Sequence, residues 1–168
     1  MKLSVLASSS SGNSVYIEDD NFRCLVDVGL TGKKITENLD RIGRDIKDID
    51  AIFVTHEHID HIKGIGVLAR KYNIPVYANK LTWDNMRKIG EIKPDLKFHF
   101  EKEDSKIFNG VVVNSFGVSH DAANPQFYTF EKDGKRVSIL TDTGYISDKM
   151  ADYVKDSHTL VYESNHEE

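Results

Sequence analysis

The chain has 168 residues, of which 39 % are hydrophobic and 29 % charged, and its net charge is −5. This length and composition predict a single globular domain over residues 1–168, large enough to bury a core. The negative charge argues against broad electrostatic binding to nucleic acid, although it leaves room for a local phosphate site. No apolar run approaches the roughly 20 residues that cross a membrane, so we expect no membrane partner.

The first half of the chain alternates predicted strands and helices. Apolar runs and alternation predict strands at 2–7, 15–17, 22–28, 51–54 and 75–78. Helical spacing of apolar residues predicts helices at 32–41, 61–72 and 81–89. The serine-rich segment 8–14 is predicted to be a polar loop.

The second half is dominated by predicted strands. Asn109-Gly110 and Asp133-Gly134 are typical two-residue hairpin turns. They predict strands at 105–108, 111–116, 126–131 and 136–140, followed by a helix at 147–154 and a strand at 159–163. Strands and helices in this order predict an α/β sandwich, with two mixed sheets packed together and helices outside.

One cysteine, Cys24, is present in the chain. A single cysteine forms no internal disulfide, which favours a cytoplasmic location. Because Cys24 lies within an apolar strand, we expect a buried, unreactive thiol.

Candidate metal ligands cluster directly after the apolar run 51–54. The segment 55–61 reads Thr-His-Glu-His-Ile-Asp-His and supplies His56, His58, Asp60 and His61. Ligands at the end of a buried strand are held by a rigid support. Imidazole and carboxylate suit Zn or Mn, with Fe as a further possibility, and the absence of cysteine here excludes a thiolate site. Later in the chain, His120 and Asp142 each follow a predicted strand and are further candidates.

This pattern resembles the metallo-β-lactamase-fold hydrolases. The resemblance implies an αβ/βα four-layer sandwich with two divalent metal ions. By the family pattern, His56, His58 and His120 hold the first ion, Asp60 and His61 hold the second, and Asp142 bridges the two. Asp27 matches an early aspartate that supports the ligand loop without binding metal.

Three segments narrow the resemblance to the WalJ/YycJ-type subgroup of bacterial cytoplasmic proteins, which is associated with nuclease activity on DNA. They are residues 7–14, the Thr-Asp-Thr-Gly at 141–144 and the Glu-Ser-Asn-His at 163–166. The family supplies a further histidine to the second metal near its C-terminus. This chain ends before such a segment, so the resemblance implies a domain that lacks its C-terminal part. His166 matches a position that donates a proton or supports a metal ligand in related nucleases, and a ligand role or a plain surface role for it stays open.

The sequence therefore predicts a binuclear metal-dependent hydrolase, most simply a phosphodiesterase or DNA exonuclease with nucleic acid as its substrate. In this hypothesis Asp60 orients the attacking water, His166 protonates the leaving group, and the segment Ser10, Ser11, Gly12 and Asn13 holds a substrate phosphate. The alternative on the same fold is a small-molecule hydrolase that cleaves a thioester, lactone or lactam. Two weaker hypotheses are a di-iron redox protein, disfavoured because His58 stands where that class has glutamate, and a non-enzymatic regulator. The oligomeric state is not predicted.

Overall fold

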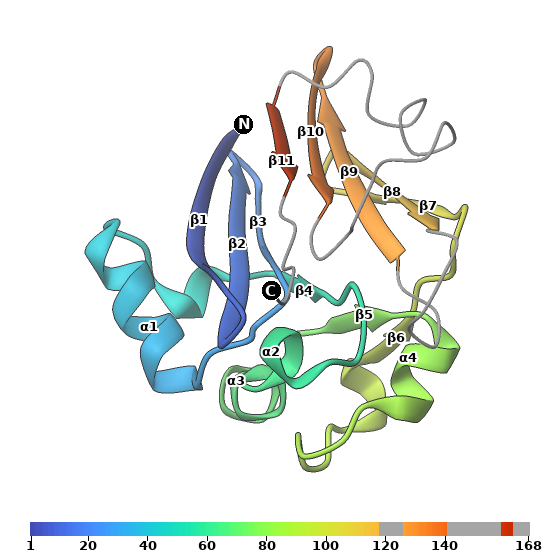
Figure 1. Ribbon diagram of the computed structural model, residues 1–168. Helices are drawn as coiled ribbons and strands as arrows, with labels where there is room; N and C mark the ends of the chain where they lie inside the picture. Colours follow the sequence, from blue (N-terminus) through green and yellow to red (C-terminus); the bar gives the residue numbers. More distant parts are fainter. Residues whose placement is uncertain (118–125, 141–158, 163–168) are drawn as a thin grey trace.

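The computed structural model describes residues 1–117, 126–140 and 159–162, and the side chains of the first two ranges. Its strands form two sheets that face each other (Figure 1). The first sheet has the order β1-β2-β3-β4-β5-β6. Its strands are β1 (Lys2–Ser9), β2 (Gly12–Asp19), β3 (Phe22–Val26), β4 (Ala51–Phe53), β5 (Val76–Ala78) and β6 (Lys97–His99). β1 to β3 pair antiparallel, whereas β3 to β6 pair parallel, so this sheet is mixed, as predicted.

The second sheet has the order β11-β10-β9-β8-β7. Its strands are β7 (Ser105–Phe108), β8 (Val111–Gly117), β9 (Gln126–Lys132), β10 (Lys135–Leu140) and β11 (Thr159–Tyr162). All pairs are antiparallel except β10 with β11. Both residues of each predicted hairpin turn have positive φ, at Asn109-Gly110 and Asp133-Gly134, which is the backbone that a type I′ turn requires.

The described helices lie along the outer side and lower end of the first sheet (Figure 1). They are α1 (Gly32–Arg41), α2 (Ile59–Ile62), α3 (Ile65–Tyr72) and α4 (Lys80–Asn85), with two short 3-10 turns, η1 (Ile46–Asp48) and η2 (Pro94–Leu96). α1 matches its predicted bounds, and the Thr31 hydroxyl accepts a hydrogen bond from Lys34 N at its start. The helix predicted at 147–154 lies outside the described residues.

Three local predictions were wrong. The helix predicted at 61–72 is divided at Gly64, whose N–H donates to Val28 O and where a Cβ would lie 2.3 Å from Leu30 O. α4 ends at Asn85 instead of residue 89, because Met86 is extended and Lys88 has positive φ. The serine-rich loop is a tight turn of Ser10 and Ser11, because β1 and β2 pair up to Ser9 and Gly12. β6, η1 and η2 were not predicted.

The core has two layers, one on each face of the first sheet. Alternate residues of β2 to β5 point to the helices, where Leu25, Ile52 and Val76 pack with residues of α1 and α3 such as Ile35 and Leu68. The other face packs against the second sheet, with a set that includes Val15, Cys24, Val26, Phe53, Val113, Tyr128, Phe130 and Ile139. Cys24 is fully buried there, as predicted, and burial raises the pKa of its thiol. No helix in the described part of the chain is long and apolar enough to cross a membrane.

Phe53 is the central side chain of the inter-sheet layer. It is fully buried, and its ring lies 5.3–6.4 Å from six aromatic rings on or next to the strands of both sheets: Phe22, Tyr77, Phe100, Phe108, Tyr128 and Phe130. Because Phe53 is the last residue of β4, this packing fixes the position of the strand that leads into residues 55–61.

We expect Phe53→Ala to lower the free energy of unfolding by about 3–5 kcal/mol, because it leaves a cavity between the sheets. The measurement is urea unfolding followed by circular dichroism. Ile107→Ala is the control, because Ile107 is 72 % exposed and its truncation should change stability by no more than about 0.5 kcal/mol. Similar losses for both variants would contradict this account of the core.

Candidate metal centre

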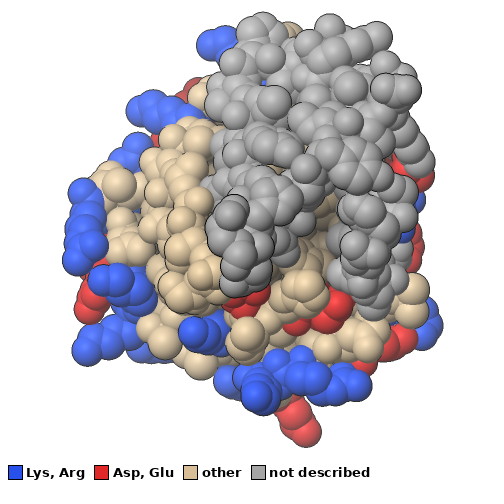
Figure 2. Space-filling model, in the orientation of Figure 1, with Lys and Arg blue, Asp and Glu red and all other residues tan. Residues whose placement is uncertain are grey.

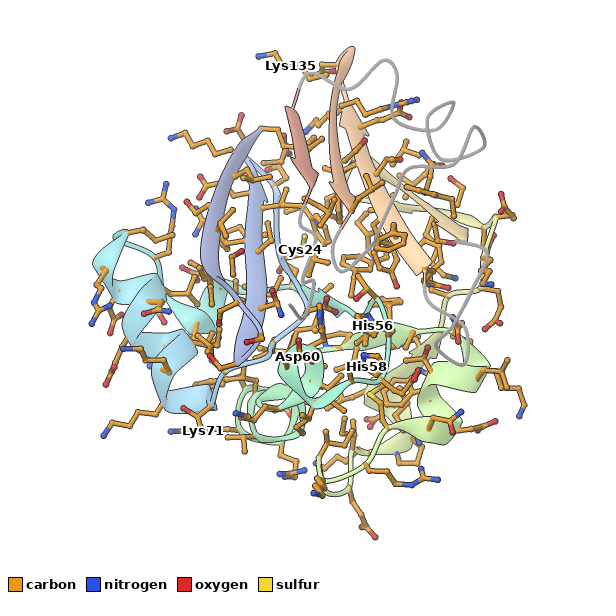
Figure 3. All side chains as sticks on the ribbon, in the orientation of Figure 1. Cys24, His56, His58, Asp60, Lys71 and Lys135 are labelled. Carbon is orange, nitrogen blue, oxygen red and sulfur yellow. The ribbon has the colours of Figure 1, made fainter. Side chains whose placement is uncertain are left out.

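The predicted ligands gather where parallel strands β3 and β4 end. Asp27 follows β3, and the segment 54–58 leads from β4 into α2, which carries Asp60 and His61. His56, His58 and Asp60 lie close together at the lower end of the two sheets (Figure 3). His56 and His61 are buried, Asp60 is partly exposed, and His58 is exposed. Ligands of both predicted metal ions therefore lie at the C-terminal ends of β3 and β4, which we call the site edge of the first sheet.

Asp27 holds this edge together through its carboxylate. Oδ1 accepts a hydrogen bond from Thr55 N at 2.8 Å, and Oδ2 accepts one from Thr55 Oγ1 at 2.7 Å. Oδ2 also lies 2.6 Å from His61 Nδ1. The Asp27 side chain is 1 % exposed, so these contacts replace the water that a buried carboxylate loses. Its φ is +63°, a left-handed backbone that aspartate tolerates better than most residues. The position and contacts of Asp27 fit the supporting role expected for it.

His61 is held between two carboxylates. Its Nδ1 contacts Asp27, and its Nε2 lies 3.4 Å from Asp60 Oδ2. Burial opposes the charged imidazole, but the two carboxylates outweigh it and raise the pKa of His61 from its ordinary 6.5 to about 10. For Asp60, burial acts to raise the pKa of the carboxyl, whereas the hydrogen bond and charge of His61 lower it below its ordinary value.

Asn13 at the start of β2 contacts the same pair. Its Nδ2 lies 2.9 Å from Ser9 O, 3.1 Å from Asp60 Oδ2 and 3.3 Å from His61 Nε2. An amide has only two N–H groups, which the two shorter contacts can use. Within the described residues its buried Oδ1 has no hydrogen-bond partner. Asn13 therefore positions Asp60 and also lies against Nε2 of His61, the ring nitrogen opposite the one that contacts Asp27.

The donor chemistry of this edge fits a divalent metal ion. Two ligand atoms about 2.1 Å from a tetrahedral ion lie about 3.4 Å apart, and Asp60 Oδ2 and His61 Nε2 are separated by 3.4 Å. The ring centroid of His56 lies 4.5 Å from that of His58 and 4.1 Å from that of His61. Within residues 1–117 and 126–140, no group of three or more His, Cys, Asp or Glu side chains forms a complete ligand set. Asp60 and His61 thus lie at a spacing that one ion accepts, with the rings of His56 and His58 close by. The other predicted ligands, His120 and Asp142, lie outside the described residues, as does His166.

Some residues of the site were not recognised as such from the sequence. Thr55 is fully buried and donates two hydrogen bonds to Asp27, which lies 28 positions away in the chain. Gly29 allows α2 to approach β2, because a Cβ there would lie 1.7 Å from Asp60 O and 2.5 Å from Asn13 N. Both residues stand next to motif residues, but their partners are distant in sequence. Local sequence patterns carry no signal of such partners.

The raised pKa of His61 predicts a pH dependence for the metal-free protein. A folded-state pKa above the unfolded value stabilises the fold below about pH 6.5, and this stabilisation is lost as pH rises through about 10. Asp27→Asn removes the larger of the two carboxylate contributions that raise this pKa, while asparagine still tolerates the positive φ. We therefore expect the free energy of unfolding of this variant to fall less than that of the wild type between pH 6.5 and 10. The measurement is urea unfolding in EDTA.

Asp133→Asn is a matched control for that measurement. Asp133 also has positive φ, at +52°, but it is exposed in the β9–β10 turn. The control should keep the wild-type pH profile. An unchanged profile for Asp27→Asn as well would show that Asp27 does not control the charge of His61.

Comparison with known proteins agrees with this geometry. The profile of the Metallo-beta-lactamase superfamily matches residues 9–164. The chain is 51 % identical, over 99 % of its length, to Exodeoxyribonuclease WalJ of Streptococcus pneumoniae, and 49 % identical over 99 % to Exodeoxyribonuclease YycJ of Bacillus anthracis. It spans 63 % and 64 % of the length of these two relatives.

Solved structures of low sequence identity share the fold. Zn²⁺-bound PqqB from Methylobacterium extorquens superimposes with a TM-score of 0.76 at 13 % identity, covering 96 % of this chain and 72 % of that one. The Rm3 metallo-beta-lactamase gives 0.71 at 18 % identity, covering 95 % and 74 %. Both the predicted fold class and the resemblance to WalJ/YycJ-type proteins are confirmed. The chain belongs to the metallo-β-lactamase superfamily.

Proposed function

We propose that this protein is a metal-dependent phosphodiesterase of the exonuclease type that acts on DNA. The observation that carries the proposal is the pairing of Asp60 with His61 beside His56 and His58, at the edge where Asp27 fixes their positions. The names of the two similar relatives, both exodeoxyribonucleases, support DNA as the substrate class. They do not favour the alternative of a small-molecule hydrolase.

The proposed site contains two divalent ions, Zn or Mn, with Fe as a further possibility. His56, His58 and His120 would hold one ion, Asp60 and His61 the other, and Asp142 would bridge them. When bound, such ions supply an activated water near neutral pH and neutralise charge on the phosphoryl oxygens. The remaining chemistry belongs to the side chains of the chain itself.

Asp60 is proposed to orient the attacking water and to accept its proton. Its carboxylate is held by Asn13 Nδ2 at 3.1 Å, which limits its rotation, and its lowered pKa keeps it ionised as a proton acceptor near neutral pH. His166 is proposed to protonate the leaving oxygen.

Substrate phosphate is proposed to bind at the turn between β1 and β2. Ser10 and Ser11 are exposed there, whereas Gly12 and Asn13 lie buried behind them. The Ser11 N–H donates to Ser9 Oγ at 3.2 Å, which orders this exposed turn. With a single cysteine that is buried, we also infer a cytoplasmic location for the protein.

We expect His58→Ala to lower Mn- or Zn-dependent hydrolysis of labelled single-stranded DNA by about 100-fold or more, because it removes a metal ligand. His99→Ala is the matched control, since His99 is also an exposed histidine but lies on β6. The control should keep the wild-type rate. Equal rates for His58→Ala and wild type would contradict the proposal.

Metal content per chain tests the two-ion arrangement separately from activity. At saturating Mn we expect two ions on the wild-type protein and one on His58→Ala or Asp60→Asn, because each change removes a ligand of a different ion. Elemental analysis after gel filtration gives the stoichiometry. A single ion on the wild type, or two ions on either variant, would contradict the assignment.

A further inference from the structure

The charge of this chain is unevenly distributed. Residues 63–97 contain eight Lys and Arg but only three Asp and Glu, a net charge of +5 in a chain whose total is −5. All eight cations are exposed. We call them the basic face: Lys63, Arg70, Lys71, Lys80, Arg87, Lys88, Lys93 and Lys97. Figure 2 shows Lys and Arg side chains gathered along the lower rim of the molecule.

The charges of the basic face are mostly not neutralised by the protein. In the part of the chain that the structure describes, one carboxylate pairs with them, Asp84 with Lys80 at 2.9 Å. Arg70 donates to the backbone carbonyls of Ile89 and Glu91, and therefore keeps its full charge. Exposed cations without carboxylate partners are the electrostatic footprint of a polyanion site.

Two segments that carry cations of the basic face adjoin the candidate metal centre. Lys63 lies between α2 and α3, three residues after Asp60. At the other side, Asn79 at the start of α4 donates to Gln126 Oε1 at 2.9 Å, and Gln126 N donates to Thr55 O. α4 is thus joined by two hydrogen bonds to the residue that precedes His56.

A cavity lined mostly by apolar side chains opens beside Lys97 of the same face. It has a volume of about 390 Å³, and its lining includes Trp83, Met86, Ile89, Ile92, Pro94 and Lys97, with Glu91 as its one carboxylate. Lys97 Nζ lies 4.9 Å from the centroid of the Trp83 ring. Cations beside an aromatic pocket match single-stranded nucleic acid, which presents phosphates and unstacked bases together, better than duplex, whose bases are stacked inside.

We propose that the basic face binds the backbone of a single-stranded nucleic acid next to the metal centre, with one base in the Trp83 cavity. This inference rests on the proposed function, because it assigns the strand-binding surface of that site. The inference explains how a chain of negative net charge would bind a polyanionic substrate. The cations are concentrated in residues 63–97, while the excess of carboxylates lies in the remainder of the sequence.

Trp83 is the only tryptophan in the chain, so its fluorescence reports directly on this cavity. In EDTA, which prevents turnover, titration with oligo(dT) should change the Trp83 emission, and the affinity should fall steeply with salt. We expect Lys88→Glu/Lys93→Glu to weaken binding at least 10-fold and to reduce the salt slope by about 0.7 for each phosphate that the variant no longer neutralises. Both side chains are exposed and make no ion pair within the described residues, so the fold should tolerate the change.

Lys47→Glu/Lys135→Glu is the matched control, with the same change in net charge at exposed sites in η1 and β10. Lys135 lies at the upper end of the molecule in Figure 3, well away from His56 and Asp60. The control should bind within about two-fold of wild type, as expected when charges are well separated from the bound strand. Equal weakening by both double variants would show that only net charge matters, and would overturn the proposed face. Duplex DNA of equal length binding more tightly than oligo(dT) would overturn the assignment of the Trp83 cavity to a base.

A small substrate separates this inference from the proposed function. Bis(p-nitrophenyl) phosphate lacks the further nucleotides that would contact Lys88 and Lys93, so Lys88→Glu/Lys93→Glu should lower hydrolysis of DNA with Mn far more than hydrolysis of this small substrate. A wild-type protein that hydrolyses neither substrate would contradict the proposed function, while the fluorescence titration would still decide the basic face. Unchanged oligo(dT) binding by this variant would overturn the face even if hydrolysis is observed.

Discussion

The buried carboxylate of Asp27 is the interaction on which the arrangement of the site depends. It joins the end of β3 to the start of the histidine segment through Thr55, and to α2 through His61. Removing a buried carboxylate from water is costly unless its lone pairs are used, and here three donors lie within 2.8 Å. The backbone joins in the same place, because Asp27 N donates to Phe53 O and Val28 N donates to His61 O. Side chain and backbone thereby fix one geometry for the segment 55–61.

The two layers of the core hold the C-terminal ends of β3 and β4 in place. Phe53 binds β4 to the second sheet by aromatic packing, and Tyr128 on that sheet donates its hydroxyl to Val54 O at 2.7 Å. Gln126 extends the link, because its amide donates to Phe100 O and to the Tyr128 hydroxyl. A strand end held from both sheets gives the histidines a rigid support, which is what a metal centre needs to keep its ligands in place.

The candidate site combines rigid and exposed parts, as the proposed hydrolysis of DNA would require. Asp27, His56 and His61 are buried and fixed, whereas His58, Ser10 and Ser11 face solvent. A polyanionic substrate would otherwise be repelled by a protein of net charge −5. In the proposed complex, the cations of residues 63–97 would counter that repulsion locally, and they follow the ligand segment directly in the chain.

The sequence by itself determined much of this protein. The alternation of apolar residues predicted most strands, the Asn109-Gly110 and Asp133-Gly134 pairs predicted two hairpins, and the motif at 56–61 predicted both the family and the position of the site, because these signals are local. Only the tertiary structure brought Asn13 and Asp27 against His61, divided the helix at Gly64, and added β6 to the sheet edge. These features depend on contacts between residues that are far apart in the chain: His61 lies 48 positions from Asn13 and 34 from Asp27. Such contacts follow from how the sheets and helices pack, which no short stretch of sequence encodes.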